Sequence, residues 1–305
     1  NRVIDRTYPH LKTNLLMGRE LARKYPDILT KIKQLFFHKI GGFALTQTSP
    51  IIIYAYTTLT VVAFYGNYML VILGIQTLMI AIFNSMNAGV GNLVAEGDRK
   101  RILSVFEELF SVRFLFTCVM CFGVFMLTPS FITLWIGKEY VLDSMTLLLM
   151  TAILFINLSR TTVDAYINAY GLFGDIWAPV TEASINIGMS VLLGYFFGLH
   201  GVLSGVLISL LLVVFCWKPY YLFRKGLDER LSIYIFMYAR HLMAALLCGV
   251  IVCLGMRYSM VQGDTTFFDG LLGILVFSIL STLTLLCVAP GMRNLMRRFI
   301  RMCHV

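Results

Sequence analysis

Eight long runs of apolar residues, separated by short polar segments, dominate the chain. Each run holds roughly 18 or more mostly apolar residues, the length that a helix needs to cross a bilayer. The pattern predicts eight transmembrane helices at about 40–62, 68–90, 114–135, 144–168, 176–197, 201–221, 233–255 and 268–289. The predicted fold class is therefore an all-α polytopic membrane protein.

Residues 147–168 of the fourth predicted span carry polar and charged side chains at helical spacing. At about 100° per residue, one narrow face of this helix holds Asn157, Arg160, Asp164 and Asn168. A charge at membrane depth costs about 2.5–3.5 kcal/mol, so such residues face a bundle interior or a wet cavity. We interpret this face as the polar wall of a pathway. The alternative is a buried structural pair between Arg160 and Asp164, four residues apart.

Two other predicted spans carry polar stripes. In the first, Gln47 lies on a polar face close to Pro50, which removes a backbone hydrogen bond. In the second, Gln76, Asn84 and Asn87 lie within a quarter turn of one another. Such groups either hold helices together or line a cavity. Because several spans show the same stripe, we favour cavity lining.

The fifth predicted span places Glu182 and Asn186 one turn apart. Near the membrane surface Glu182 would be a hydrated anchor. Deeper in the membrane it would be a candidate for proton or ion coupling, because a desolvated carboxylate binds a proton more readily. Asp164 is the second candidate for this role.

Two charged segments are too polar to cross a membrane. Residues 92–112 are predicted to form an amphipathic connector, with Leu103, Phe106, Leu109 and Phe110 on its apolar side. Residues 27–38 have helical apolar spacing with lysines between, which is typical of a segment lying on an anionic leaflet. A solvated basic linker is the alternative for this second segment.

The composition supports a membrane protein, and the charge predicts its orientation. The chain has 58% hydrophobic and 13% charged residues, against about 25% charged in soluble domains. The net charge is +9, but 22 of the 25 basic residues fall in the two terminal segments and in alternate loops. By the positive-inside rule both ends of the chain are predicted to be cytoplasmic, so this charge does not predict a nucleic-acid partner.

The sequence carries no signature of an enzyme or a cofactor site. We find no phosphate-binding loop, no nucleophile elbow and no metalloprotease motif, and we expect neither catalytic residues nor a metal. Cys118 and Cys121 have a C-x-x-C spacing inside an apolar span, where buried inert thiols are the expected reading. The chain starts at Asn1 without a visible signal peptide, and we expect it to be part of a longer protein.

Three stretches carry a resemblance to a known family. They are IKQLFFHKIGGFALTQTSPIII at 32–53, NAGVGNLVAEGDRKR at 87–101 and SRTTVDAYINAYGLFGDIWAPVTEASIN at 159–186. In order and spacing they resemble the C-terminal part of Wzx-type O-antigen and capsule flippases, of the multidrug/oligosaccharidyl-lipid/polysaccharide exporter superfamily. The family fold has two six-helix lobes around a central cavity, so the resemblance implies that the first lobe is missing here.

The resemblance implies a division of the chain and a function. The implied parts are a basic cytoplasmic segment (1–39), a six-helix lobe (40–221), a cytoplasmic loop (222–232), two additional helices (233–289) and a basic cytoplasmic tail (290–305). The implied function is alternating-access flipping of a lipid-linked oligosaccharide, of the undecaprenyl-pyrophosphate type, across the bacterial inner membrane for surface polysaccharide biosynthesis. Expected partners are this substrate, membrane lipids and the polysaccharide polymerase and ligase machinery.

The family also implies which side chains face the cavity, in agreement with the periodicity. These are Gln76, Asn84, Asn157, Arg160, Asp164 and Glu182. The alternatives are a multidrug or cation antiporter or a cell-wall precursor flippase of the same superfamily, a scaffold for polysaccharide enzymes that does not transport, and a membrane glycosyltransferase. Arg160 argues against a cation exporter, whose cavity should be acidic on balance.

Overall fold

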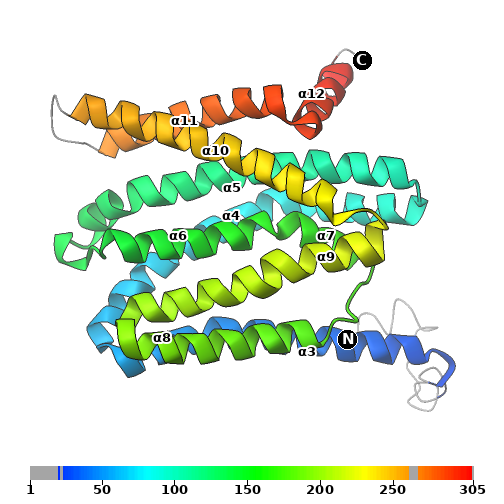
Figure 1. Ribbon diagram of the computed structural model, residues 1–305, viewed down its shortest axis with the longest axis horizontal. Coiled ribbons are helices and arrows are strands. Elements are labelled where there is room, and N and C mark those ends of the chain that lie inside the picture. Colours follow the sequence, from blue (N-terminus) through cyan, green and yellow to red (C-terminus); the bar gives the residue numbers. More distant parts are fainter. Residues whose placement is uncertain (1–19, 21–22, 261–266, 304–305) are drawn as a thin grey trace, which may run out of the picture.

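The computed structural model describes residues 20, 23–260 and 267–303, and the regular elements in this part of the chain are all helices (Figure 1). The long helices are α3 (Pro26–Tyr56), α4 (Leu59–Glu96), α5 (Arg99–Trp135), α6 (Ser144–Ser159), α7 (Thr161–Ala169), α8 (Trp177–Ser209), α10 (Leu231–Met260), α11 (Phe267–Val288) and α12 (Pro290–Cys303). Shorter elements are η2 (Lys138–Tyr140), the π-helical segments η3 (Leu210–Trp217) and η4 (Phe223–Leu227), and α9 (Lys218–Leu222) between them. Most of the predicted basic segment 1–39 lies outside the described residues.

Six helical stretches of the described chain are long and apolar enough to cross a membrane. They are Leu59–Glu96, Arg99–Trp135, Ser144–Ala169, Trp177–Leu227, Leu231–Met256 and Phe267–Val288. The protein is thus an all-α polytopic membrane protein, as predicted. The fifth and sixth predicted spans both fall in Trp177–Leu227, and most of the first lies in α3.

Trp177–Leu227 turns back on itself at Gly198, whose φ of 55° and ψ of −130° interrupt α8. The two arms then pack closely. A Cβ on Gly205 would lie 2.3 Å from the backbone nitrogen of Ser190, so the second arm needs a glycine at this contact. The Ser190 hydroxyl donates to the carbonyl of Val202 at 3.0 Å and joins the arms. This helical hairpin is the lower layer of the bundle in Figure 1 together with α3.

The first predicted span, 40–62, has wrong boundaries. α3 ends at Tyr56, the backbone of Thr57 is extended, and α4 begins at Leu59. The hydroxyl of Thr58 accepts a hydrogen bond from the backbone N–H of Val61 at 3.4 Å and caps α4. Thr57 and Thr58 end one helix and start the next without a charge, a glycine or a proline, inside a mostly apolar stretch. The apolar pattern therefore does not reveal this turn.

The predicted connector 92–112 is not a separate element. Its first residues complete α4, Gly97 has a φ of 77°, and the Asp98 carboxylate accepts from the backbone N–H groups of Lys100 (3.1 Å) and Arg101 (3.2 Å) to start α5. The rest forms the first turns of α5. Of the predicted apolar side, Phe106, Leu109 and Phe110 are buried.

A turn at the opposite end leads into α6. Asp143 caps this helix by accepting from the backbone N–H and the hydroxyl of Thr146, at 3.0 and 2.7 Å, and it also bonds His200 at 2.9 Å. Partial burial acts to raise the pKa of Asp143, but these hydrogen bonds outweigh it and lower the pKa from 3.8 to about 2. The cap therefore stays charged at neutral pH.

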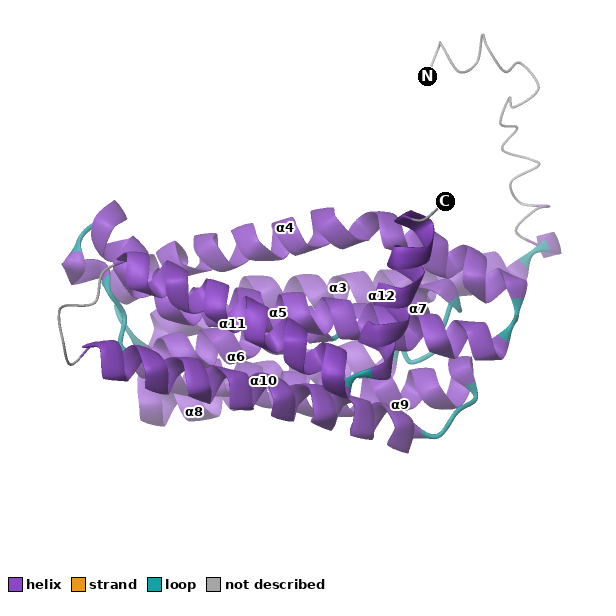
Figure 2. Ribbon diagram, turned by 90° about the horizontal axis from the view of Figure 1, so that it is seen from above, coloured by secondary structure: helices purple, strands orange, loops and turns teal. Residues whose placement is uncertain are grey.

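Two large apolar clusters hold the bundle together. One joins the first half of α5 to α7, η4 and α10 through aromatic contacts, such as Phe106 with Tyr166 at 5.0 Å between ring centres. The other joins α3, α6 and the α8 hairpin to the first half of α4. α4 itself lies along one edge of the bundle (Figure 2) and is the least buried of the candidate spans.

Basic residues gather at one end of the bundle. The start of α3, the α4–α5 turn, the turn between η4 and α10, and α12 all lie at the right in Figure 1. These segments carry Lys31, Arg99, Lys100, Arg101, Arg224, Lys225, Arg230 and the four arginines of α12. The loops that the sequence assigns to one side of the membrane thus meet at one end of the molecule.

Candidate functional site: a polar cavity among the helices

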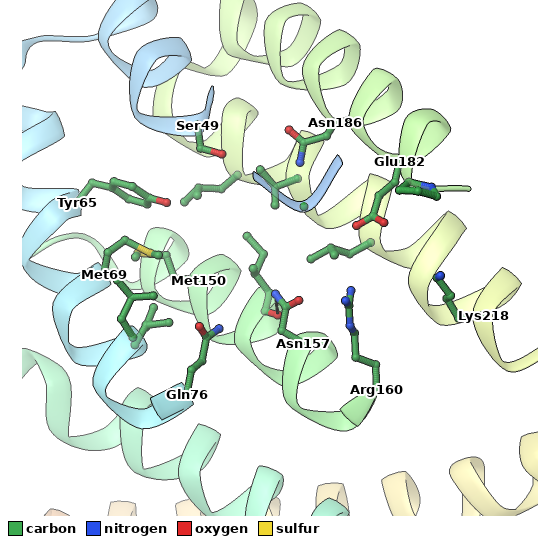
Figure 3. A pocket seen from close by; sticks show the side chains of 18 residues that line it. Ser49, Tyr65, Met69, Gln76, Met150, Asn157, Arg160, Glu182, Asn186 and Lys218 are labelled. Atoms are coloured by element: carbon green, nitrogen blue, oxygen red, sulfur yellow. Dashed lines mark hydrogen bonds between the residues drawn. The ribbon is translucent and has the colours of Figure 1, made fainter. Parts of the chain in front are cut away.

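A cavity of about 430 Å³ lies among α3, α4, α6, the α8 hairpin, η3 and α9 (Figure 3). Its apolar lining includes Met69, Ile72, Met150, Ile153, Leu203, Val206 and Leu210. Its polar and charged lining consists of Ser49, Tyr65, Gln76, Asn157, Arg160, Glu182, Asn186 and Lys218. Figure 3 shows Arg160, Glu182 and Lys218 together at one end and Tyr65 at the other. The volume is in the range of small-molecule sites, which is about 300–1,000 Å³.

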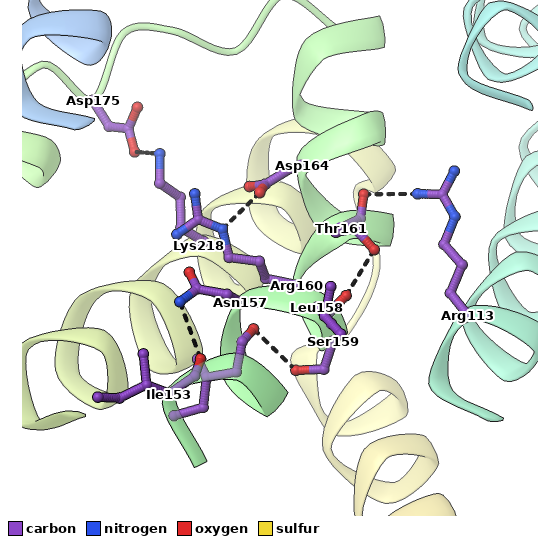
Figure 4. Close-up of polar contacts among 11 residues, drawn as sticks. Arg113, Ile153, Asn157, Leu158, Ser159, Arg160, Thr161, Asp164, Asp175 and Lys218 are labelled. Atoms are coloured by element: carbon purple, nitrogen blue, oxygen red, sulfur yellow. Dashed lines mark hydrogen bonds and ion pairs between the residues drawn. The ribbon is translucent and has the colours of Figure 1, made fainter. Parts of the chain in front are cut away.

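Arg160 reaches the cavity from the junction of α6 and α7. Its Nε donates to Oδ2 of Asp164 at 2.8 Å, and both side chains are 32% exposed (Figure 4). The guanidinium group points across the cavity toward Glu182, a buried residue of α8 whose carboxylate also attracts it. The structure thus contains the Arg160–Asp164 pair that the sequence offered as the alternative, and the paired arginine also lines the cavity.

Lys218 brings a second cation to the same end of the cavity. Its Nζ lies 3.4 Å from Oδ2 of Asp175, and the two side chains are only 10% and 1% exposed. The indole N–H of Trp217 donates to the same oxygen at 3.2 Å. Lys218 falls near the end of the sixth predicted span, 201–221, and lies where η3 ends and α9 begins, in the wall of the cavity.

Two asparagines of the lining, Asn157 and Asn186, lie between the charged end of the cavity and the end that holds Tyr65. Asn157 donates from Nδ2 to the carbonyl of Ile153 at 3.0 Å. Buried Asn186 donates to the hydroxyl of Ser209 at 3.3 Å, and its Oδ1 has no hydrogen-bond partner within the described part of the chain. A buried carbonyl oxygen without a donor is costly, so Asn186 is ready to accept a hydrogen bond from a ligand.

The structure brings only some of the predicted site residues together. Gln76, Asn157, Arg160 and Glu182 line the cavity, and Asp164 contacts it through Arg160. Asn84 and Asn168 are exposed and do not line the cavity. Asn84 lies eight residues beyond Gln76, and Asn168 lies eight residues beyond Arg160, which is about 12 Å along a helix. The side chain of Gln47 lies outside the described residues.

Asn87 has a different role from the predicted one, and it reveals a buried charge that the sequence pattern missed. Its Oδ1 accepts from Nη2 of Arg113 at 2.9 Å, while Nη1 of Arg113 donates to the carbonyl of Thr161 at 2.9 Å. Arg113 is 2% exposed and joins α5 to α4 and to the α6–α7 junction. Its partner at the junction, Thr161, directly follows Arg160 in the chain (Figure 4). Its position 14 residues into α5, far from the Arg99–Arg101 turn, is the signal that separates it from the loop charges.

Metal ligands do not cluster in the described part of the chain, where no group of three or more His, Cys, Asp or Glu side chains could hold an ion. Cys118 and Cys121 are buried free thiols. The cavity lining itself offers a ligand two cations, a carboxylate and several amide and hydroxyl groups.

The fold defines a polytopic membrane protein with an internal polar cavity. No protein-family model, curated protein or solved structure matches the chain. The resemblance to polysaccharide flippases stays a prediction from the sequence motifs.

Proposed function

We propose that the protein is part of a flippase that moves a lipid-linked oligosaccharide, joined to its lipid through a diphosphate, from the inner to the outer leaflet of the bacterial cytoplasmic membrane. The observation that carries the proposal is the cationic end of the cavity, where Arg160 and Lys218 meet from two different elements. Each cation is paired with an aspartate, so a ligand with two negatively charged groups can bind both by exchanging with these carboxylates.

The two cations suit the two halves of such a head group. The guanidinium of Arg160 is planar and binds phosphate oxygens in pairs, whereas the ammonium of Lys218 acts as a compact point charge. Asp164 and Asp175 neutralise these cations in the absence of substrate. A diphosphate would replace both carboxylates as the partner, so binding would loosen the contacts that hold α7 and the segment before α8.

The amide groups suit the sugar. Asn157, Asn186 and Gln76 can hydrogen-bond hydroxyl groups, and Tyr65 offers a ring and a hydroxyl at the far end of the cavity. The lipid tail stays in the bilayer beside the helices. Glu182, facing Arg160, is positioned to take up a proton or cation when the arginine engages the diphosphate.

A cation or drug antiporter is the competing proposal from the same superfamily. Its support is Glu182, the one carboxylate that lines the cavity among the described residues. Arg160 already faces Glu182, so a cationic substrate would have to displace the arginine from this carboxylate. The flippase is therefore the proposal that the lining chemistry supports best.

The test uses cells that carry the intact gene. Deletion should make lipid-linked oligosaccharide accumulate in the membrane while surface polysaccharide falls, and the wild-type gene should reverse both effects. Arg160→Ala should reduce export roughly 10- to 100-fold, the equivalent of one charge-assisted hydrogen-bonded contact. Arg160→Lys should restore little, because a lysine cannot bind two oxygens at once.

Lys218 is tested with its partner, since removing one member of a buried pair destabilises a protein by itself. The double variant Lys218→Met/Asp175→Asn keeps the pair neutral and should still lose export. Asn84→Ala, on an exposed face outside the cavity, is the matched control and should export normally. Normal export by both Arg160→Ala and the double variant, at wild-type membrane levels, would refute the proposal.

A further inference from the structure

Helix α12 runs across the direction of the spanning helices in both views (Figures 1 and 2). The spanning helices follow the membrane normal, so α12 extends along the membrane surface. It follows α11 after a single residue, Ala289, and it lies at the end of the bundle where the basic turns gather. Because the apolar span Phe267–Val288 ends two residues before Pro290, α12 begins where this span leaves the hydrocarbon, at the level of the lipid headgroups.

The first turn of α12 is fixed on α5. Ala289 and Met292 are buried in a small apolar cluster with Leu115 of α5. A Cβ on Gly291 would lie 2.4 Å from the carbonyl oxygen of Glu107, so the two helices touch backbone to backbone. About two turns further, Nη2 of Arg298 lies 3.3 Å from Oε1 of Glu108, whose side chain is 4% exposed.

On the sides that do not face α5, α12 leaves two neighbouring faces uncovered. Arg293, Arg297 and Arg301 are spaced four residues apart on one exposed face. Met296 and Ile300, 39% and 49% exposed, occupy the adjacent face. The helix has no acidic residue. A row of arginines beside an apolar strip, at headgroup level, is the pattern of a helix embedded in the surface of an anionic membrane.

We propose that α12 binds anionic phospholipids of the adjacent leaflet. Arg293, Arg297 and Arg301 contact the phosphate groups, while Met296 and Ile300 insert among the first carbons of the acyl chains. A second copy of the chain is a poorer occupant, because pairing this face with itself would place arginines against arginines. Each arginine near an anionic surface contributes about a fivefold preference, so three together favour the bound helix roughly 100-fold.

The experiment measures amide hydrogen exchange of the full chain in lipid nanodiscs. One set contains phosphatidylcholine alone, and the other contains phosphatidylcholine with phosphatidylglycerol. Residues 297–303 should exchange at least about tenfold more slowly in the anionic discs, because bound helices open less often. Raising the ionic strength should shrink the difference. The first turn of α12, held by α5 in both discs, is the internal control.

A triple substitution on the helix tests the assignment to side chains. Replacing Arg293, Arg297 and Arg301 by Gln should abolish the lipid effect, and replacing them by Lys should keep most of it. The matched control replaces three basic residues at the same end of the bundle, Arg224 and Lys225 of η4 and Arg230 of the following turn, by Gln and should leave the α12 response intact.

Three outcomes would overturn the proposal. Equal exchange in both kinds of disc would show that α12 does not sense lipid charge. A lipid effect that survives the Gln substitutions on α12 would assign the binding to other residues. Protection that depends on two protein copies per disc, and not on the lipid, would identify a second chain as the occupant.

Discussion

Arg113 is a charged side chain buried between three elements of the bundle, and its hydrogen bonds explain how the protein tolerates it. Its two terminal nitrogens donate to Thr161 and Asn87, each at 2.9 Å, and its guanidinium lies 5.2 Å from the ring centre of Phe83. Charge-assisted hydrogen bonds and the aromatic contact replace part of the lost hydration. The residue therefore connects the α6–α7 junction, and with it Arg160, to α4 and α5.

We expect Arg113→Met to destabilise the protein by about 1.5–3 kcal/mol, because methionine fills the space but leaves the Thr161 carbonyl and the Asn87 amide without their donor. Thermal unfolding in detergent measures the change. Arg99→Met is the control. Arg99 pairs with Asp228 at 2.9 Å, but both side chains are about 70% exposed, so its loss should cost no more than about 1 kcal/mol. Equal effects of the two substitutions would contradict the structural role of Arg113.

At this scale the sequence predicts the cavity only in part. Arg160, Asn157, Gln76 and Glu182 are found because a polar residue inside an apolar run must face something polar. The pattern does not identify Lys218 and Arg113 as buried, because each lies near the end of an apolar run, where a basic residue is typical of a loop. Whether such a residue turns inward depends on helix winding, here the π-helical turns of η3, and on partners that are distant in sequence.

Among the elements, the uninterrupted helices α3, α4 and α5 exceed the thickness of the membrane core by the largest margin. α3, α4 and α5 have 31, 38 and 37 residues, or about 46, 57 and 55 Å, against a hydrocarbon core of about 30 Å. The sequence divided α4 and α5 into spans and a connector because charge marks the water boundary. Charge alone does not end a helix, whereas the Gly97–Asp98 turn does. These helices extend past the membrane at the end that carries the basic turns.

The turn at Gly198 allows a matched pair of glycine substitutions. We expect Gly198→Ala to destabilise by about 1–3 kcal/mol, because its φ of 55° is unfavourable for a residue with a Cβ, although that Cβ would make only an ordinary contact, 3.8 Å from Cγ2 of Thr57. Gly188→Ala, in the same helix and with no atom within 4 Å of the new Cβ, should instead stabilise by about 0.5–1 kcal/mol. Thermal unfolding of the two variants should shift in opposite directions; shifts of the same sign would contradict the hairpin turn.

For the whole molecule, the positive-inside rule gives an orientation that labelling can check. In a cysteine-free background we expect Lys138→Cys to react with a membrane-impermeant maleimide in intact cells. Lys100→Cys and Arg230→Cys, at the basic end, should react only after the cells are permeabilised. The reverse pattern would invert the assignment and place the cationic end of the cavity on the outer side.

The number and type of the helices follow from the sequence at this scale, because a long apolar run in lipid has few alternatives to a helix. Their assembly does not. The contact of α3 with the α8 hairpin, and of α12 with α5, joins segments more than 100 residues apart, and no periodicity within a helix encodes its neighbour.

The closeness of the two arms around Gly198 bears on how the chain enters its membrane during synthesis. The first arm carries Asn186 and Ser190, whose partners, Ser209 and the Val202 carbonyl, belong to the second arm. If the first arm left the translocation channel alone, these side chains would face lipid unsatisfied. We therefore expect both arms to be released together, so that a ribosome paused soon after Gly198 holds a segment that has not yet partitioned into the bilayer.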